Sequence, residues 1–328
     1  MKGAHQPSSG FPRWLLTSAR WILSLAVLAL LIHFFPLATL RDAISKIPPA
    51  RFLIVLVLYL CAHGVGVLKW RMIVNAAGAE LDLATSAQCY FGGLFGTLFL
   101  PSIIGGDVVR LAVGLRKSSR PAAVLAGNLA DRFLDVAAQA GLVLLGLFLL
   151  PASLPPSWRE KALGYASVLG IGILVLGAAS YFVYRATIGR SPWKLRRRIV
   201  RLRHALRSVK RRPLILIAAW LAGTTIQFTF LVLTALLAIS CGLKLPLRVW
   251  LFAWPLAKLA AVLPLTQGGM GVREAALVAL LVPFGAPGAL VLAAGLVWEG
   301  VIIAGGFISG GIALVLRQSS SSSNASND

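Results

Sequence analysis

The chain has 328 residues, of which 58% are hydrophobic and 13% are charged, and its formal net charge is +22 at pH 7. Soluble domains carry about 25% charged residues, so this composition excludes an ordinary soluble domain. Apolar stretches of roughly 20 residues recur, which is the length needed to cross a bilayer core of about 30 Å. The basic excess follows from the positive-inside rule, and no nucleic-acid partner is expected because no zinc-finger or helix-turn-helix pattern is visible.

The first half of the chain, about 21–150, combines full spans with a broken apolar run. A basic tail at 1–20 is predicted to be cytoplasmic. The second span is expected to end at an aromatic-basic group typical of a cytoplasmic interface, Lys69, Trp70 and Arg71. The predicted full spans are 21–40, 52–68 and 121–150.

Between the second and third spans lies an apolar run that glycine and proline interrupt, at 89–104. Basic residues flank it on both sides, Arg71 before it and Arg110 and Arg116 after it. A full crossing would place one of these basic flanks outside, against the positive-inside rule. We therefore expect a re-entrant hairpin, whose broken backbone is tolerated at membrane depth only inside protein or a wet cavity.

The second half, about 163–317, repeats this order. Residues 185–213 form the most basic stretch and are expected to be a cytoplasmic loop. A second broken region follows at 250–287, and the polar end of the chain, 318–328, is predicted to be disordered. The predicted full spans are 163–184, 214–241 and 288–316.

The predicted fold is thus all-α and polytopic, a single transmembrane domain at 21–317 with about six full spans and two broken hairpins. The first half is predicted to start on the cytoplasmic side of the membrane and the second on the outer side. This arrangement is an inverted-topology repeat, in which transporters place binding sites at discontinuous helices.

Charged residues gather beside the two broken regions. An ionised side chain at the bilayer centre costs about 2.5–3.5 kcal/mol, so such residues normally face the bundle interior and pair. One interpretation is that they form internal salt bridges that hold helices together, and the other is that they form a polar relay or a binding site. The residues are Asp107, Asp131, Arg132, Asp135, Glu274 and Glu299, with Arg110 and Arg273.

Each break also places glycines just before a predicted helix. A helix N-terminus presents unpaired N–H groups and the positive end of its dipole, so it attracts anions. The arginine that follows each break has a planar fork that suits phosphate. The alternative is that the glycines only permit tight packing. The predicted head-group phosphate site comprises Gly105, Gly106, Arg110, Gly268, Gly269, Gly271 and Arg273.

Covalent chemistry finds little support. No Ser-His-Asp, HExxH or Cys-His pattern is present, and no cofactor or metal site is predicted. Asp131 and Asp135 lie one helical turn apart on one face. Such a pair is compatible with a proton relay, or with the metal ligands of a membrane phosphatase or transferase.

The motif order resembles the flippase-like transmembrane region of lysylphosphatidylglycerol synthases. The similarity rests on Leu100-Pro101-x-x-x-Gly105-Gly106-Asp107-x-x-Arg110, then Asp131-Arg132-x-x-Asp135, then Pro264 and Gly268-Gly269-x-Gly271-x-Arg273-Glu274-Ala275, and it extends from about 25 to 316. In bifunctional members this region is proposed to move aminoacylated phosphatidylglycerol between leaflets, while a separate soluble domain attaches the amino acid. The resemblance implies lipid translocation without the synthase activity.

The sequence therefore predicts a non-enzymatic inner-membrane lipid translocase with both termini in the cytoplasm and an anionic phospholipid or lipid-linked intermediate as substrate. A membrane scaffold for a lipid-modifying glycosyltransferase is the first alternative, which makes such an enzyme a possible partner. A membrane lipid phosphatase or transferase is the second alternative. The oligomeric state is left open.

Overall fold

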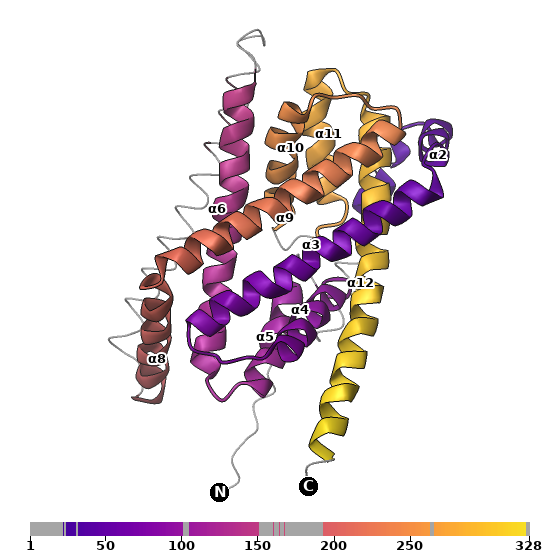
Figure 1. Ribbon diagram of the computed structural model, residues 1–328. Coiled ribbons are helices and arrows are strands. Elements are labelled where there is room, and N and C mark those ends of the chain that lie inside the picture. Colours follow the sequence, from indigo (N-terminus) through magenta and orange to yellow (C-terminus); the bar gives the residue numbers. More distant parts are fainter. Residues whose placement is uncertain are drawn as a thin grey trace, which may run out of the picture.

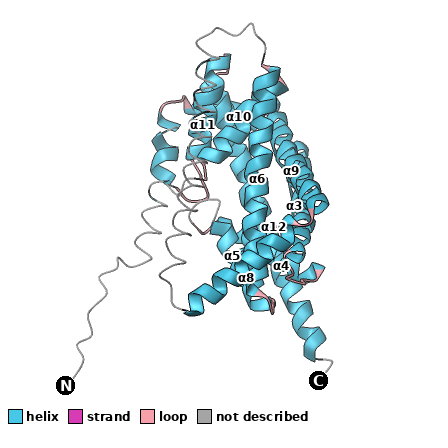
Figure 2. Ribbon diagram, turned by 90° about the vertical axis from the view of Figure 1, so that its left-hand side faces the viewer, coloured by secondary structure: helices cyan, strands magenta, loops and turns pink. Residues whose placement is uncertain are grey.

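A computed structural model describes residues 22, 24–30, 32–100, 105–150, 160, 164, 167, 193–262 and 266–325. These residues are helical apart from short connections, and none of them forms a strand (Figures 1 and 2). The all-α prediction is confirmed. The predicted span at 163–184, apart from residues 164 and 167, and the motif residues Pro101 and Pro264 lie outside the described residues.

In the first half, residues 24–30 are helical, and two of the helices that follow begin at a proline, Pro49 and Pro121. Proline is favoured in the first turn because its missing N–H would have no intrahelical partner there. Asp82 caps a shorter helix by accepting a hydrogen bond from the Thr85 amide at 3.2 Å. The helices are α2 Leu37–Ser45, α3 Pro49–Ala76, α4 Leu83–Thr97, α5 Gly105–Lys117 and α6 Pro121–Leu149.

The second half follows the same order. Its helices are α8 Trp193–Lys210, α9 Pro213–Ser240, α10 Leu247–Ala260, α11 Val272–Leu281, the 3-10 turn η1 Val282–Phe284 and α12 Gly288–Ala325. Helix α8 occupies most of the stretch that the sequence marks as a basic cytoplasmic loop. It packs against α6, its residues Ala205 and Val209 are buried, and its residues Arg201, Arg203 and Arg207 are exposed.

Four described helices are long and apolar enough to cross a membrane: Pro49–Ala76, Pro121–Leu149, Pro213–Ser240 and Gly288–Gln318. All four begin within three residues of the start of a predicted span. Helix α12 runs on to Ala325, through a segment predicted to be disordered. The reason is that adding residues to an existing helix costs far less than nucleating one, and no proline stops it there.

Two predictions for the N-terminal spans are wrong in detail. The first span does not continue unbroken to residue 40, because the chain turns at Phe34 and Pro36 then precedes α2. The second span does not end at Lys69, since α3 runs on to Ala76. Lys69 is 4% exposed and Trp70 is fully buried, so they are interior residues and not an interface anchor.

The two halves have matching architecture. Helices α3 and α9 are each 28 residues long, and each ends in a turn with a left-handed glycine, Gly78 or Gly242. A helical hairpin follows in each half, α4–α5 or α10–α11, and then a long helix, α6 or α12. Figure 1 shows that α3 and α9 run in opposite directions, as do α6 and α12.

The hairpins lie at opposite ends of the molecule, α4–α5 with α8 at the lower end and α10–α11 at the upper end (Figures 1 and 2). The described helices therefore have the inverted arrangement that the charge pattern predicts.

Each hairpin packs on the last helix of the other half, α4 on α12 and α10 on α6. Glycines make these approaches close. A Cβ at Gly146 of α6 would lie 2.5 Å from the Phe252 amide nitrogen of α10. A Cβ at Gly310 of α12 would lie 2.6 Å from the Phe95 ring of α4. The halves are thus interlocked, and each hairpin has protein on one side, which fits the requirement that broken backbone at membrane depth be supported by protein or a wet cavity.

Candidate functional site

Charged residues of the first half meet in one largely buried cluster, which we call the first charge cluster: Lys69, Asp107, Arg110, Asp131, Arg132 and Asp135. Asp131 is at its centre and is fully buried. Its carboxylate lies 2.8 Å from the Lys69 ammonium, 3.3 Å from Arg110 and 3.1 Å from Arg132. Three cations therefore converge on one carboxylate at the junction of α3, α5 and α6.

The two flanking carboxylates complete the cluster. Asp107 of α5 contacts both Arg110 and Arg132 at 3.3 Å. Asp135 of α6 lies 2.9 Å from Arg132 and also pairs with Lys69. Three cations and three carboxylates thus balance one another, which offsets the cost of taking charges out of water.

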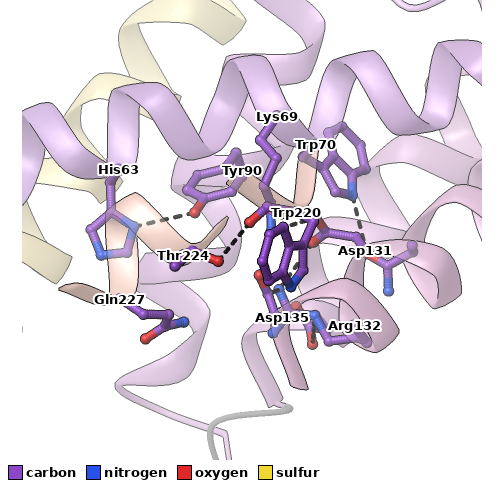
Figure 3. Close-up of polar contacts among 12 residues, drawn as sticks. His63, Lys69, Trp70, Tyr90, Asp131, Arg132, Asp135, Trp220, Thr224 and Gln227 are labelled. Atoms are coloured by element: carbon purple, nitrogen blue, oxygen red, sulfur yellow. Dashed lines mark hydrogen bonds and ion pairs between the residues drawn. The ribbon is translucent and has the colours of Figure 1, made fainter. Parts of the chain in front are cut away.

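Lys69 ties this cluster to α9. Figure 3 shows its side chain projecting toward Asp131 and Asp135, with Thr224 of α9 near its end. Gly223 of α9 lies against the cluster, since a Cβ there would be in ordinary contact with an Asp135 oxygen at 3.4 Å and with the Lys69 nitrogen at 3.6 Å. The first charge cluster therefore touches a helix of the second half.

Aromatic side chains surround Arg110 and lead away from it. Its guanidinium lies 4.3 Å from the centre of the Tyr90 ring, in a cation–π contact. The Tyr90 hydroxyl lies 3.3 Å from the His63 ring nitrogen Nδ1. The ring centres of His63 and Tyr59 are 4.4 Å apart, and those of Tyr59 and Trp298 are 5.7 Å apart. This ring series leads from the first half to α12 of the second half.

The second half has its own buried group, the second charge cluster: Arg273, Glu274 and Glu299. The Arg273 guanidinium lies 2.6 Å from Glu274 and also pairs with Glu299 of α12. Glu274 has a further role, because its other oxygen accepts a hydrogen bond from the Gly271 amide at 2.8 Å. This bond caps α11 from within the chain.

Both halves join their second hairpin helix to their last long helix through buried charges, Asp107 to Arg132 in one and Arg273 to Glu299 in the other. The second charge cluster holds two carboxylates and one cation, so it carries an excess negative charge. No ion pair among the described residues connects the two clusters.

The predicted phosphate-binding glycines divide into two kinds. Gly105 and Gly106 allow close packing, since a Cβ at Gly106 would lie 2.5 Å from the Gly93 carbonyl oxygen of α4. Gly268, Gly269 and Gly271 have φ angles of 59°, 80° and 82° and form the turn that leads into α11. The tight-packing alternative thus explains the first pair, and the phosphate assignment stays a prediction for all of them.

The turn before α11 also buries polar groups. Gln267 is 1% exposed, and neither its amide oxygen nor its amide nitrogen has a hydrogen-bond partner among the described residues. Within the same part of the chain, the Thr266 hydroxyl is likewise buried without a partner. Both predicted phosphate-binding arginines, in contrast, are buried against carboxylates, at 5% exposure for Arg110 and 4% for Arg273. A phosphate would have to replace one of those carboxylates to reach either guanidinium.

Sequence reasoning missed three residues of the site. Lys69 was assigned to the membrane surface, although a basic residue that close to an apolar span also fits an interior partner for the acids of α6. Lys258 was overlooked, although a lone cation inside an apolar stretch is a functional signal. Gln227 carries no signal in the sequence that separates it from a packing residue. Its amide oxygen accepts a hydrogen bond from Lys258 at 2.7 Å.

The long apolar helices, the broken hairpins and the charges buried among them define a polytopic α-helical membrane protein. The family described as the lysylphosphatidylglycerol synthase TM region matches residues 21–310, so the chain belongs to that family. The resemblance in the sequence motifs is thereby confirmed. Searches among curated proteins and among solved structures found no match.

Proposed function

We propose that this protein moves a lipid with an anionic head group between the leaflets of the inner membrane, without covalent chemistry. The observation that supports this most is the placement of a buried charge cluster at the broken helix of each of two inverted halves. In many secondary transporters, substrates bind near the bilayer midplane where such repeats meet. Family membership supports a role at the membrane but leaves the activity open.

The head group is proposed to exchange with the carboxylates that hold Arg110 and Arg273. A phosphate and a carboxylate are both suited to the planar fork of arginine. Replacing one with the other costs less than exposing a bare guanidinium to the bilayer. In this scheme Asp131, Asp135, Glu274 and Glu299 neutralise the arginines when no lipid is bound, or carry a coupling proton. The glycine amides of Gly268 and Gly269 would add hydrogen bonds to the phosphate.

The orientation follows from the basic residues. The connection between α5 and α6 contains Arg120, and Arg116 and Lys117 lie in the last turn of α5. This connection and the basic helix α8 lie at the same end of the molecule (Figure 1). The positive-inside rule places that end in the cytoplasm. The hairpin α4–α5 would then face the cytoplasm and α10–α11 the outer side, and a lipid-modifying enzyme is a possible partner on either face.

The test is lipid movement in reconstituted vesicles with a variant that keeps the charge balance. The pair Arg273→Gln and Glu299→Gln removes one cation and one carboxylate together, so the cluster's net charge does not change. We expect native protein to move fluorescent phosphatidylglycerol between leaflets and the double variant to move it at least about 10-fold more slowly, the effect of about 1.4 kcal/mol. Thermal unfolding of both proteins in detergent checks that the variant is folded. A folded double variant that transports at the native rate would contradict the assigned role.

A further inference from the structure

We propose that Lys258 binds the anionic group of the lipid head group while the arginines of both charge clusters are still paired with carboxylates. This inference rests on the proposed function in taking the ligand to be a lipid. It assigns the first contact to a residue outside the predicted phosphate site, in the last turn of α10.

Lys258 differs from the neighbouring buried cations in its partners. Lys69, Arg110, Arg132 and Arg273 each contact at least one carboxylate. Among the residues that the structure describes, no carboxylate lies within ion-pair distance of the Lys258 ammonium. Its recorded contacts are a hydrogen bond to the neutral amide of Gln227 at 2.7 Å and the Phe230 ring, whose centre is 5.2 Å away.

The ammonium therefore has capacity for an anion. It has three N–H donors, of which Gln227 takes one. A cation at membrane depth costs about 2.5–3.5 kcal/mol on insertion scales, and the other cations offset this cost with carboxylates. Among the described residues, Lys258 has instead an amide oxygen and an aromatic face as its partners. A phosphate supplied by a ligand would satisfy the remaining donors.

The position of Lys258 suits a shared binding site. Helix α10 packs against α6, α9 and α11, and so reaches elements of both halves. Lys258 is close enough to Asp135 of the first charge cluster and Arg273 of the second to interact with both electrostatically. It is half-buried, whereas Arg110 and Arg273 are buried. An anionic group thus meets Lys258 without displacing any carboxylate, at a position that both charge clusters influence electrostatically.

A purely electrostatic alternative is that Lys258 only balances the excess negative charge of Glu274 and Glu299 from a distance. The two readings differ in one respect. A balancing charge acts only through long-range electrostatics, so a carboxylate placed beside Lys258 would weaken lipid binding far less than the loss of a direct contact does. A head-group contact would be blocked by such a carboxylate. The substitution Gln227→Glu places it 2.7 Å from the ammonium, at the position of the present amide oxygen.

The experiment measures binding separately from transport. Purified native protein in detergent is titrated with short-chain phosphatidylglycerol, phosphatidic acid and phosphatidylcholine, and with free glycerol phosphate. The rise in unfolding temperature reports binding. We expect the two anionic lipids to stabilise the native protein more than phosphatidylcholine does. Free glycerol phosphate is expected to have a weaker effect, because it lacks acyl chains. An equal effect of glycerol phosphate would identify the ligand as free phosphate and overturn the lipid assignment.

Three variants complete the design. Both Lys258→Gln and Gln227→Glu are expected to weaken the binding of anionic lipid about 10- to 100-fold, the range for hydrogen bonds to charged groups. Lys258→Arg keeps the charge and is expected to bind within a few-fold of native. The control is Lys46→Gln, because Lys46 is exposed and paired with Asp42 outside the clusters.

Unchanged binding in Lys258→Gln, or in Gln227→Glu, would overturn the proposal. So would a native protein that does not distinguish anionic from zwitterionic lipid. Binding that depends on Lys258 without movement of lipid in vesicles would instead contradict the proposed function and leave the binding site in place.

Discussion

The two charge clusters are built on equivalent elements but are not alike. In the first, three cations face three carboxylates around Asp131, and the members come from α3, α5 and α6. In the second, Arg273 faces Glu274 and Glu299, and another cation of the second half, Lys258, is paired with an amide. The difference teaches that a repeated fold need not repeat its chemistry. In the first cluster the positive and negative charges are equal in number. The second cluster has one more carboxylate than cations, and the cation Lys258 of the same half has no carboxylate partner among the described residues.

The first cluster should be the less tolerant of the two. Asp131→Asn leaves three cations with two carboxylates in a buried site, and removing one partner of a buried pair costs about 3–5 kcal/mol. We expect this variant to lower the unfolding temperature of the purified protein strongly, or to prevent its accumulation. Asp42→Asn is the control, since Asp42 is exposed and its pair with Lys46 is worth at most about 1 kcal/mol. Equal effects of the two substitutions would show that Asp131 does not hold the cluster together.

The second cluster is tested by a double-mutant cycle between Arg273 and Glu299. The single changes Arg273→Gln and Glu299→Gln each leave a charge without its partner. The double change should lower the free energy of unfolding by less than the sum of the two single changes, and the difference is a coupling free energy of about 0.5–3 kcal/mol. Unfolding in denaturant or by heat measures all four proteins. Additive effects would mean that the two side chains are independent in the folded protein.

Packing at the first hairpin gives a smaller effect. A Cβ at Gly106 would lie 2.1 Å from the Thr97 hydroxyl oxygen and 2.5 Å from the Gly93 carbonyl oxygen. Gly106→Ala should therefore destabilise the protein by about 1–3 kcal/mol through overpacking. Gly64→Ala in α3 is the matched control, because a Cβ at Gly64 meets nothing within 4 Å. It should be neutral, or stabilising by up to about 1 kcal/mol through helix propensity. A Gly106→Ala protein as stable as Gly64→Ala would contradict the close approach of α4 and α5.

The smallest effect concerns the start of each hairpin. Asp82 caps α4 with its side chain, whereas Pro246 before α10 makes no such bond. Asp82→Ala should cost about 1 kcal/mol. Partial burial by itself would raise the pKa of Asp82, but hydrogen bonds from Thr85 outweigh it and lower the pKa below its ordinary value.

The capping contribution is therefore present above the ordinary pKa of Asp82 and is lost as the pH falls through the lower pKa of the folded protein. Unfolding temperatures of native and Asp82→Ala protein, measured at neutral and at strongly acidic pH, should differ at the first and converge at the second. A constant difference across that range would show that the carboxylate does not cap the helix in its ionised form.

Much of the fold could be predicted because the bilayer restricts it. Apolar length identified 121–150 and 214–241, which are α6 and α9 within one residue at each described end. Glycine and proline identified the broken regions, and the distribution of arginine and lysine identified the inverted order. The exact reach of α3 could not be predicted, because hydropathy falls at Lys69 whether that residue faces water or a buried carboxylate.

The sequence predicted which residues belong to the site but not which of them pair with one another. The sequence marks Asp131 and Arg273 as costly residues in a membrane, and both are buried and paired. It does not say that Lys69 and Asp135, far apart in the chain, form a pair. Nor does it show that Arg110 and Arg273 are already occupied by carboxylates. Such pairings depend on how helices cross, and a single sequence carries no direct record of that.

The central claim is that the protein moves lipid between leaflets, and the most direct measurement is the quenching of fluorescent phosphatidylglycerol in vesicles with a membrane-impermeant reagent. Empty vesicles lose only the signal of the outer leaflet. The account predicts that vesicles with native protein lose nearly all of it, because labelled lipid from the inner leaflet becomes accessible. Native, folded protein that leaves the inner-leaflet signal intact, for phosphatidylglycerol and for polyprenyl-phosphate carriers alike, would contradict the account.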